Sequence, residues 1–517
     1  MRRTLASSIG VTCAAVLALP LAPSAVVAAA GPGGTAPTAP HTAVTTGSST
    51  PGSTQSLPLQ PLDPDRASGA ATFGLAPRSV RHFSLVGVIW DDPAAELHGQ
   101  VQVRARAADT GAWSDWQDVE AHNADHAADP ETAERASDRV RGATAPLWVG
   151  ASDGVEIRVR AEAGPDSEPE PKAGSGSAGS TAGEGAGKGA EEAAPLLPSG
   201  MRLELVDPGE DPPSEAAPSE GSAAESPDEN PGRHPADGSA GTPADAPRTS
   251  VMSAEATAAS AADAPLVPLG AAEIPALTRA ETEEEYHALR GAETAGQQRD
   301  TAGQEADTGG QPQAEPYIGP RPGIVTRGGW GADESLREET FVYTGKVGAA
   351  FVHHSASGNN YTCEQAPSVI RGIYRYHTES MGWRDIGYNF LVDKCGKIYE
   401  GRAGGVANPV LGAHTMGFNS DTMGVAVLGT FSSTDPPSAA VTGIAQLTAW
   451  KLGLYGMDPS AKTYLTSGGG NLYEKGTKVR LDVISGHRDG FNTECPGGKL
   501  YDKLGTARSA AAGYQGR

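Results

Sequence analysis

Two histidines at the end of one apolar run and a histidine and a cysteine in a later loop have the types and spacing of a metal site. His353 and His354 end the run at residues 347–354, and His487 and Cys495 lie in the segment HRDGFNTECPG. Imidazole and thiolate suit Zn²⁺, and three protein ligands leave a fourth position for water, as in catalytic sites. Successive strand side chains point to opposite faces, so only one of the adjacent histidines can be a ligand. Spacing alone leaves open that the histidines are structural and that Cys495 is an inert buried thiol.

The cysteines restrict the covalent chemistry. The chain has Cys13, Cys363, Cys395 and Cys495, and Cys13 lies in a predicted export signal. Of the three that remain, two should pair in an oxidising compartment, and the sequence allows three pairings. Cys395 follows a predicted strand and Cys363 precedes the helix leading to it. We therefore predict a disulfide between Cys363 and Cys395, which leaves Cys495 as a thiol beside the histidines.

Strand and helix patterns alternate from residue 317 nearly to the end of the chain, and these elements must position the candidate ligands. The predicted helices cover residues 365–380, with His377 on one flank, and 441–455. The predicted strands cover residues 347–354, 388–392, 397–400, 423–428 and 479–485. This alternation predicts an α/β domain with a central mixed sheet flanked by helices.

A smaller all-β, sandwich-like domain is predicted nearer the N-terminus. Apolar and polar residues alternate strictly in the segment QVQVRARA at residues 100–107, which is typical of a strand with one buried face. Further strands are expected at residues 82–90, 146–149, 155–161 and 201–206. Trp113 and Trp116 could stack on sugars or pack a sheet edge, and packing is the commoner role of large aromatics.

The remaining segments predict an exported chain with long linkers. Residues 1–30 are expected to be a signal peptide, because Arg2 and Arg3 precede an apolar run that is too short for a membrane span. Pro, Gly, Ser and Thr-rich composition predicts a linker at 31–75, and a low-complexity insert at about 164–198 within a β domain of 76–207. An acidic disordered linker is expected at 208–315, with a short helix around residues 282–290 as its one element, before the α/β domain of 316–517.

The charge distribution gives no argument for nucleic-acid binding. The net charge is −23, yet residues 316–517 carry 20 Lys and Arg against 17 Asp and Glu. The acidity belongs to the N-terminal part, where mixed Pro, Gly and Ser composition indicates solvated spacers. We expect no nucleic-acid partner, no membrane span in the mature protein, and a monomer.

Six segments resemble the peptidoglycan recognition protein family and the related phage lysozyme-type zinc N-acetylmuramoyl-L-alanine amidases, in the family's order over residues 316–510. They are WGAD, FVHHSA, GWRDIGYNFLVD, IYEGR, GAHTMGFN and GHRDGFNTECPG. The resemblance implies an amidase domain of that fold, with Zn²⁺ as cofactor and peptidoglycan, a glycan strand with its stem peptide, as partner.

The resemblance also implies roles for single residues. The zinc ligands fall on His353, His487 and Cys495, and two active-site side chains fall on Tyr388 and Thr493. The substrate groove falls on His414, Arg402 and Asn419, and we place His377 there as well, although capping of turns is an equal alternative for Arg402 and Asn419. No Glu occupies an obvious matching position for a general base, and Glu494 is a weak candidate.

We therefore expect a secreted, cell-wall-associated enzyme that hydrolyses the amide bond between N-acetylmuramic acid and L-alanine. Family members that only bind peptidoglycan typically lack the cysteine ligand, which this chain retains. A non-catalytic peptidoglycan-binding module is the alternative, and a zinc peptidase acting within the stem peptide is a third possibility.

Overall fold

The computed structural model describes residues 52–62, 72–121, 126–162, 197–210, 252–300 and 317–517, with side chains left undescribed at 290–300. The predicted signal peptide and nearly all of the predicted insert at 164–198 lie outside the described residues. Among the described helices, none combines the length and the apolar composition that crossing a bilayer requires.

The N-terminal domain is an antiparallel β structure, as predicted. Its central path runs β1–β8–β3–β7–β4–β5, with β2 and β6 paired to β3. The inward-facing residues of β4, Val101, Val103 and Ala105, are buried in its core. The strands are β1 (Ser53–Pro58), β2 (Gln60–Pro61), β3 (Thr72–Trp90), β4 (Gly99–Ala107), β5 (Gln117–Val119), β6 (Gly142–Ala143), β7 (Leu147–Ala161) and β8 (Arg202–Asp207).

The N-terminal boundary of this domain differs from the prediction. Strand β1 lies inside the predicted linker 31–75 and pairs along its whole length with β8. It is an edge strand with the sequence STQSLP, which lacks apolar alternation and ends in a proline that an edge position tolerates. Backbone pairing therefore orders a segment that its composition assigns to a linker.

Strands β3 and β7 are longer than the sequence pattern indicates. β3 extends the predicted strand 82–90 back to Thr72, and β7 joins two predicted strands into one. Their pairing carries register shifts between Leu75 and Arg78 and between Ser79 and Phe83. Such bulges bend a strand and interrupt its two-residue alternation, which hides its true length in the sequence.

Trp113 and Trp116 face arginines. The guanidinium carbon of Arg158 lies 4.0 Å from the centroid of the Trp116 ring, and that of Arg104 lies 5.3 Å from the Trp113 ring and 5.2 Å from the Trp116 ring. Arg106 lies 6.0 Å from the Trp113 ring. The rings are engaged by cations of their own domain, which favours packing over sugar stacking.

The C-terminal domain contains the predicted mixed sheet, in the order β17–β11–β14–β12–β13–β10–β9. The β11–β14, β11–β17, β12–β14 and β10–β13 pairs are parallel, whereas β12–β13 and β9–β10 are antiparallel. The strands are β9 (Glu273–Ile274), β10 (Ile324–Val325), β11 (Ala349–His354), β12 (Phe390–Val392), β13 (Ile398–Glu400), β14 (Thr422–Val427) and β17 (Ile484–Gly486). A separate ribbon pairs β15 (Lys462–Thr466) with β16 (Lys478–Asp482).

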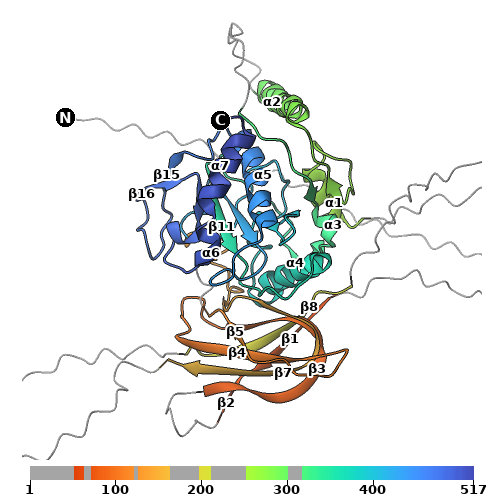
Figure 1. Ribbon diagram of the computed structural model, residues 1–517, viewed down its shortest axis with the longest axis vertical. Helices are drawn as coiled ribbons and strands as arrows, with labels where there is room; N and C mark the ends of the chain where they lie inside the picture. Colours follow the sequence, from red (N-terminus) through yellow and green to blue (C-terminus); the bar gives the residue numbers. More distant parts are fainter. Residues whose placement is uncertain (1–51, 63–71, 122–125, 163–196, 211–251, 301–316) are drawn as a thin grey trace, which may run out of the picture. The chain divides into compact units, whose positions relative to one another are not determined.

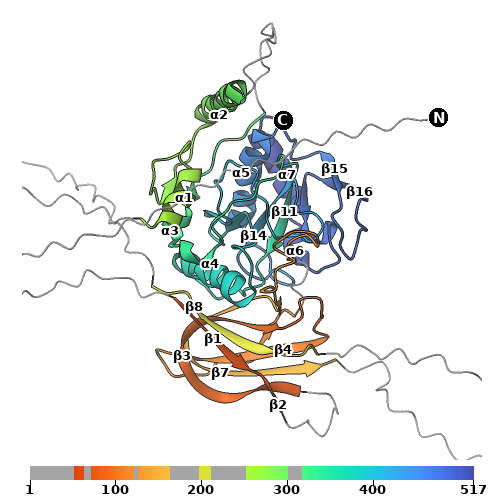
Figure 2. The same cartoon turned by 180° about the vertical axis from the view of Figure 1, so that it is seen from behind.

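Helices cover both faces of this sheet (Figures 1 and 2). On one face, α5 (Ser438–Leu454) and α7 (Leu504–Tyr514) pack on the outward residues of β12 and β14, including Phe390 and Val425. On the other face, α4 (Ala366–Arg375) packs on Leu391 and Ala426. The predicted helix 365–380 is α-helical only to Arg375. A π-helical turn, Tyr376–Ser380, follows it directly. The remaining short helices are α3 (Arg327–Trp330) and α6 (Gly498–Tyr501).

Part of the predicted acidic linker 208–315 belongs to the C-terminal domain. Helices α1 (Ala254–Ala262) and α2 (Arg279–Asp300) and the two-residue strand β9 lie in this stretch. Ile274 of β9 is fully buried, and the Asp263 carboxylate accepts the Val406 N–H at 2.8 Å. The helix expected around 282–290 lies within α2, whereas the Ala-rich composition of α1 and the shortness of β9 conceal these two elements in the sequence.

The predicted disulfide is confirmed. Cys363 bonds to Cys395, and Cys495 is buried and belongs to no disulfide. The bridge ties the start of the α4 region to the turn after β12.

Because the bridge closes a loop between positions 32 residues apart, we expect a Cys363→Ser/Cys395→Ser chain to lose about 3–4 kcal/mol of unfolding free energy. Denaturation by guanidinium, followed by tryptophan fluorescence, measures this. An unchanged midpoint for the double variant would contradict it.

Candidate metal centre

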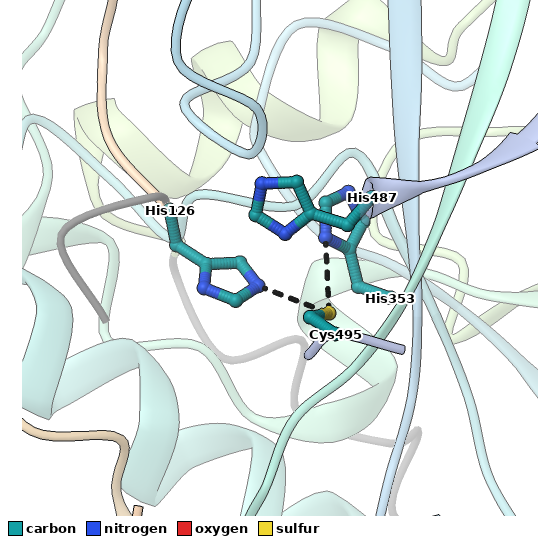
Figure 3. Close-up of side chains that lie close together, drawn as sticks. All are labelled: His126, His353, His487 and Cys495. Atoms are coloured by element: carbon teal, nitrogen blue, oxygen red, sulfur yellow. Dashed lines mark hydrogen bonds between the residues drawn. The ribbon is translucent and has the colours of Figure 1, made fainter. Parts of the chain in front are cut away.

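Four buried side chains converge beside the carboxyl ends of β11 and β17, at one edge of the C-terminal sheet. They are His126, His353, His487 and Cys495, and one potential ligand atom from each lies within 4.8 Å of the others. The Cys495 sulfur lies 3.5 Å from Nε2 of His126 and 3.7 Å from Nδ1 of His353. Figure 3 shows the three imidazoles and the thiol facing one another.

The parallel register of the sheet explains why His353 and His487 meet. Strand β17 pairs with β11 so that Gly486 lies opposite Val352. Val352 is followed by His353, and Gly486 is followed by His487. The centroids of these two imidazole rings are 4.5 Å apart. Sequence positions 134 residues apart become neighbours because parallel strands end at the same edge of a sheet.

The loop after β17 returns Cys495 to this edge. A single 3₁₀ turn, His487–Asp489, follows the strand, and the Arg488 N–H donates to the Cys495 carbonyl at 3.0 Å. Gly490 fits against the Phe351 ring, where a Cβ would lie 2.9 Å from a ring carbon. The tight loop thus needs glycine at this position to bring the thiol beside the histidines.

A chain of hydrogen bonds behind His353 fixes which nitrogen faces the cluster. The Thr422 hydroxyl donates to the Phe418 carbonyl, so it accepts from Nε2–H of His414, at 3.4 Å. The His414 Nδ1 is then an acceptor, and it lies 3.3 Å from Nε2 of His353. This pattern leaves the lone pair of His353 Nδ1 directed at the cluster.

Burial keeps both of these imidazoles neutral. Desolvation, followed by the nearby His487 and His126 rings, holds the pKa of His353 and that of His414 well below the ordinary value for histidine. A neutral imidazole has the lone pair that metal binding requires.

His354 points the other way. The Phe431 N–H donates to its Nδ1 at 3.3 Å, and its Nε2 lies 3.6 Å from a Glu120 carboxylate oxygen. The structure therefore brings one of the two adjacent histidines into the cluster and leaves the other hydrogen-bonded elsewhere in the core.

Tyr388 lies beside the cluster, just before β12. Its ring centroid is 5.5 Å from that of His353 and 5.8 Å from that of His126, and the residue is buried. Thr493 is half-buried, and its hydroxyl oxygen accepts the Cys495 N–H at 3.1 Å. Glu494 is directed to solvent, with 91% of its side chain exposed and its carboxylate 3.4 Å from Arg488.

The four expected groove residues are all buried. His414 lies behind His353, as described above. The His377 Nδ1 accepts the Gly387 N–H at 3.2 Å, and its ring packs on Trp383 at 4.5 Å. Burial lowers the pKa of His377 to about 3, so this ring is neutral. Arg402 and Asn419 hold side-chain and backbone groups of the N-terminal domain.

His126 is the one member of the cluster that the sequence analysis did not single out. It lies in the N-terminal domain, in the polar segment AHNADHAADP, 227 residues before His353. The segment has no apolar periodicity, and its one metal-like signal is His122, which precedes His126 at the H-x3-H spacing of some zinc sites. Only the three-dimensional packing of two domains reveals it.

Comparison with known proteins matches both domains. Residues 343–498 match the family model described as N-acetylmuramoyl-L-alanine amidase, and residues 39–177 match the model described as Rv3811 N-terminal galactose-binding domain-like. Peptidoglycan-recognition protein SC2 of Drosophila simulans is 30% identical over 185 residues, which cover 35% of this chain and 85% of that protein.

Two further similarities concern the same domain. The N-acetylmuramoyl-L-alanine amidase of Homo sapiens is 30% identical over 190 residues, covering 36% of this chain and 28% of that protein. The solved structure of wild-type Drosophila PGRP-LB is 26% identical and covers 35% of this chain and 91% of that chain, with a TM-score of 0.28.

Fold and matched segments together define an amidase-type domain with a mixed sheet, preceded by a galactose-binding-like β domain. The chain belongs to the peptidoglycan-recognition protein family. The predicted family and fold class are thereby confirmed.

Proposed function

We propose that this protein is a zinc-dependent N-acetylmuramoyl-L-alanine amidase, which hydrolyses the amide bond between N-acetylmuramic acid and L-alanine in bacterial peptidoglycan. The observation that carries the proposal is Cys495. Its thiol is buried, belongs to no disulfide and lies 3.7 Å from His353 Nδ1, at the position where the family resemblance puts the third zinc ligand.

The donor set and its spacing suit zinc. Zinc bonds sulfur at about 2.3 Å and imidazole nitrogen at about 2.0–2.1 Å, so tetrahedral geometry separates the two donors by about 3.5 Å. The separations of Cys495 Sγ from His126 and His353 are 3.5 and 3.7 Å. His353, His487 and Cys495 would hold the ion within the C-terminal domain.

Bound zinc would polarise the scissile carbonyl and supply hydroxide at neutral pH. The protein's own part is to position the amide and stabilise the negative charge that develops on its oxygen. The hydroxyls of Tyr388 and Thr493 are the proposed donors. Thr493 accepts the Cys495 N–H through its oxygen and so keeps its proton for donation.

Of the two residues Tyr388 and Glu494, only Tyr388 lies where it can contact the reacting groups. The Tyr388 ring lies within 6 Å of two rings of the cluster, at 5.5 and 5.8 Å. Glu494, by contrast, is 91% exposed and lies beside Arg488. Geometry is the first requirement for a general base or acid.

The proposed setting is outside the cytoplasm, at the cell wall. The domain carries a disulfide, Cys363–Cys395. Disulfides persist in oxidising compartments and are rare in cytosolic proteins. The expected export signal at residues 1–30 agrees with this setting.

The test is to incubate the full chain and its His126→Ala variant with purified peptidoglycan, and to identify released fragments by mass spectrometry. We expect free stem peptides with L-alanine at the N-terminus, lost with a zinc chelator and restored by zinc. Cleavage within the stem peptide would instead indicate a peptidase. Binding to the wall without cleavage by either chain would leave a recognition module.

His414 supports a further prediction, because it holds the far nitrogen of a ligand histidine. Loss of such a partner typically weakens metal binding by about 10–100-fold. We expect His414→Ala to lower zinc affinity by that factor, measured by competition with a chromogenic chelator. His287→Ala, on the exposed surface of α2, is the matched control. Equal affinities for the two variants would rule out the positioning role.

A further inference from the structure

Residues 126–141 of the N-terminal domain, here called the covering segment, lie between β5 and β6 and reach into the proposed active site. The segment starts with His126, whose Nε2 lies 3.5 Å from Cys495 Sγ. Its ring centroid is 4.5 Å from that of His487 and 5.1 Å from that of His353. A hydrolytic zinc site needs a position for water, and here an imidazole from another domain lies among the three expected ligands.

Glu134, a second member of the covering segment, binds the Arg402 guanidinium. Both guanidinium nitrogens donate to the Glu134 carboxylate, Nη1 at 2.9 Å and Nη2 at 2.8 Å, and both side chains are buried. Burial would raise the pKa of Glu134, but the Arg402 charge and its hydrogen bonds lower it, so the carboxylate is ionised. Any anionic group of a substrate that reaches Arg402 must displace this bidentate pair.

Asp129, a third member of the covering segment, binds the turn that carries Asn419. The Asp129 carboxylate accepts the Gly417 N–H and the Asn419 side-chain amide, each at 2.7 Å. The same Asn419 amide donates to the Ala127 carbonyl at 2.8 Å. Glu134, Asp129 and Ala127 of one segment thus bond to Arg402 and Asn419, two of the expected groove residues.

The far end of the covering segment is fixed as well. The Arg141 N–H donates to the Met381 carbonyl at 3.0 Å, and Val140 is buried in an apolar cluster with residues of α4. A segment held at both ends and at three intermediate points is an ordered occupant rather than a loop lying by chance over a cleft.

We infer that the covering segment is an intramolecular inhibitor: His126 completes the metal's coordination as a fourth protein ligand, while Asp129 and Glu134 occupy the substrate groove. This inference rests on the proposed function. With the segment in this closed position, His126, His353, His487 and Cys495 would all hold the metal, and no position for water would remain. Hydrolysis then requires the segment to leave, so the closed population lowers the apparent affinity for substrate.

The first experiment reads the coordination directly, without catalysis. The full chain is loaded with Co²⁺ in place of zinc, and its visible absorption is followed as azide, a small anionic ligand, is added. We expect the wild-type spectrum to be insensitive to azide and the His126→Ala spectrum to change, because only the variant has an open position. His98→Ala, on a half-exposed histidine of the same domain, is the control and should behave as wild type.

The second experiment measures hydrolysis of a soluble muropeptide by the zinc-loaded full chain. We expect His126→Ala and Glu134→Gln each to raise kcat/KM by about 10–100-fold, the usual range of coupling between sites. Glu134→Gln keeps the shape of the side chain and removes its charge, so it weakens the hold on Arg402 without emptying the site. Circular dichroism melting confirms that each variant is folded.

The outcomes separate the two proposals. Equal azide responses of wild type and His126→Ala would overturn the inhibitor role, whatever the hydrolysis rates. A His126→Ala chain that hydrolyses more slowly than wild type would also overturn it, since His126 would then assist the reaction. An azide response confined to His126→Ala, with no cleavage by any chain, would support the fourth ligand and reject the amidase.

Discussion

Replacing Cys495 by serine is expected to abolish hydrolysis of the muramoyl–alanine bond while leaving most binding to peptidoglycan intact. The thiol is buried at the cluster and is the only cysteine of the described residues outside a disulfide. Serine is a poor zinc ligand, and zinc contributes several kcal/mol of transition-state stabilisation. Each 1.4 kcal/mol is a factor of ten, so the loss should be at least about 10³-fold in kcat.

The measurement is the rate of stem-peptide release at saturating zinc, together with zinc content by atomic absorption and wall binding by sedimentation. The variant should be made in both the wild-type and the His126→Ala chains. Ser509→Ala, on the exposed surface of α7, is the control for handling and folding. A Cys495→Ser chain with full activity would show that the zinc mechanism is wrong.

Tyr388→Phe is expected to lower kcat by about 10²–10³-fold, because it removes one hydroxyl donor to the developing oxyanion. KM should change little, since the ring and its packing beside His353 and His377 are retained. A donor that acts only in the transition state lowers kcat and kcat/KM equally.

Single-turnover rates on a soluble muropeptide measure this, with zinc content showing that the metal is still bound. Tyr464→Phe is the matched control, because Tyr464 is 68% exposed on the β15–β16 ribbon. If Tyr388→Phe instead raised KM at constant kcat, the hydroxyl would serve ground-state binding and the oxyanion role would be rejected.

The part of the candidate site that lies within one domain could be predicted from sequence. His353 is the penultimate residue of an apolar strand and His487 follows another strand, and parallel pairing brings such positions to one sheet edge. The alternation rule predicts that only one of His353 and His354 faces the site, and the family resemblance selects His353. His126 carries no such signal, because its role depends on packing between two domains rather than on local periodicity.

The fold shows the same division. Strands β4, β11 and β14 have strong apolar patterns, and the structure places them close to their predicted bounds. Strand β1 and the two-residue strand β9 are ordered by backbone pairing with strands distant in sequence. The composition of a segment indicates how much apolar surface it can bury by itself. It does not indicate whether a strand elsewhere in the chain will pair with it.

The apolar cluster beneath α4 determines how the covering segment could leave. Leu85, Trp148 and Val206 of the N-terminal domain share that cluster with Val369 and Ile373 of α4. The Tyr376 hydroxyl donates to the Thr144 carbonyl across the same boundary, at 3.1 Å. Parting the two domains would expose this shared core to water, and exposing apolar surface costs about 25 cal/mol per Å².

Local opening of the covering segment alone exposes less apolar surface than separation of the domains. It therefore costs less free energy. Native-state amide exchange should then show residues 126–141 opening independently of β3 and α4, as a separate cooperative unit. The domains would stay joined throughout the catalytic cycle. The latency of the enzyme, meaning the fraction of molecules held in the inhibited form, would be set by the local stability of the covering segment.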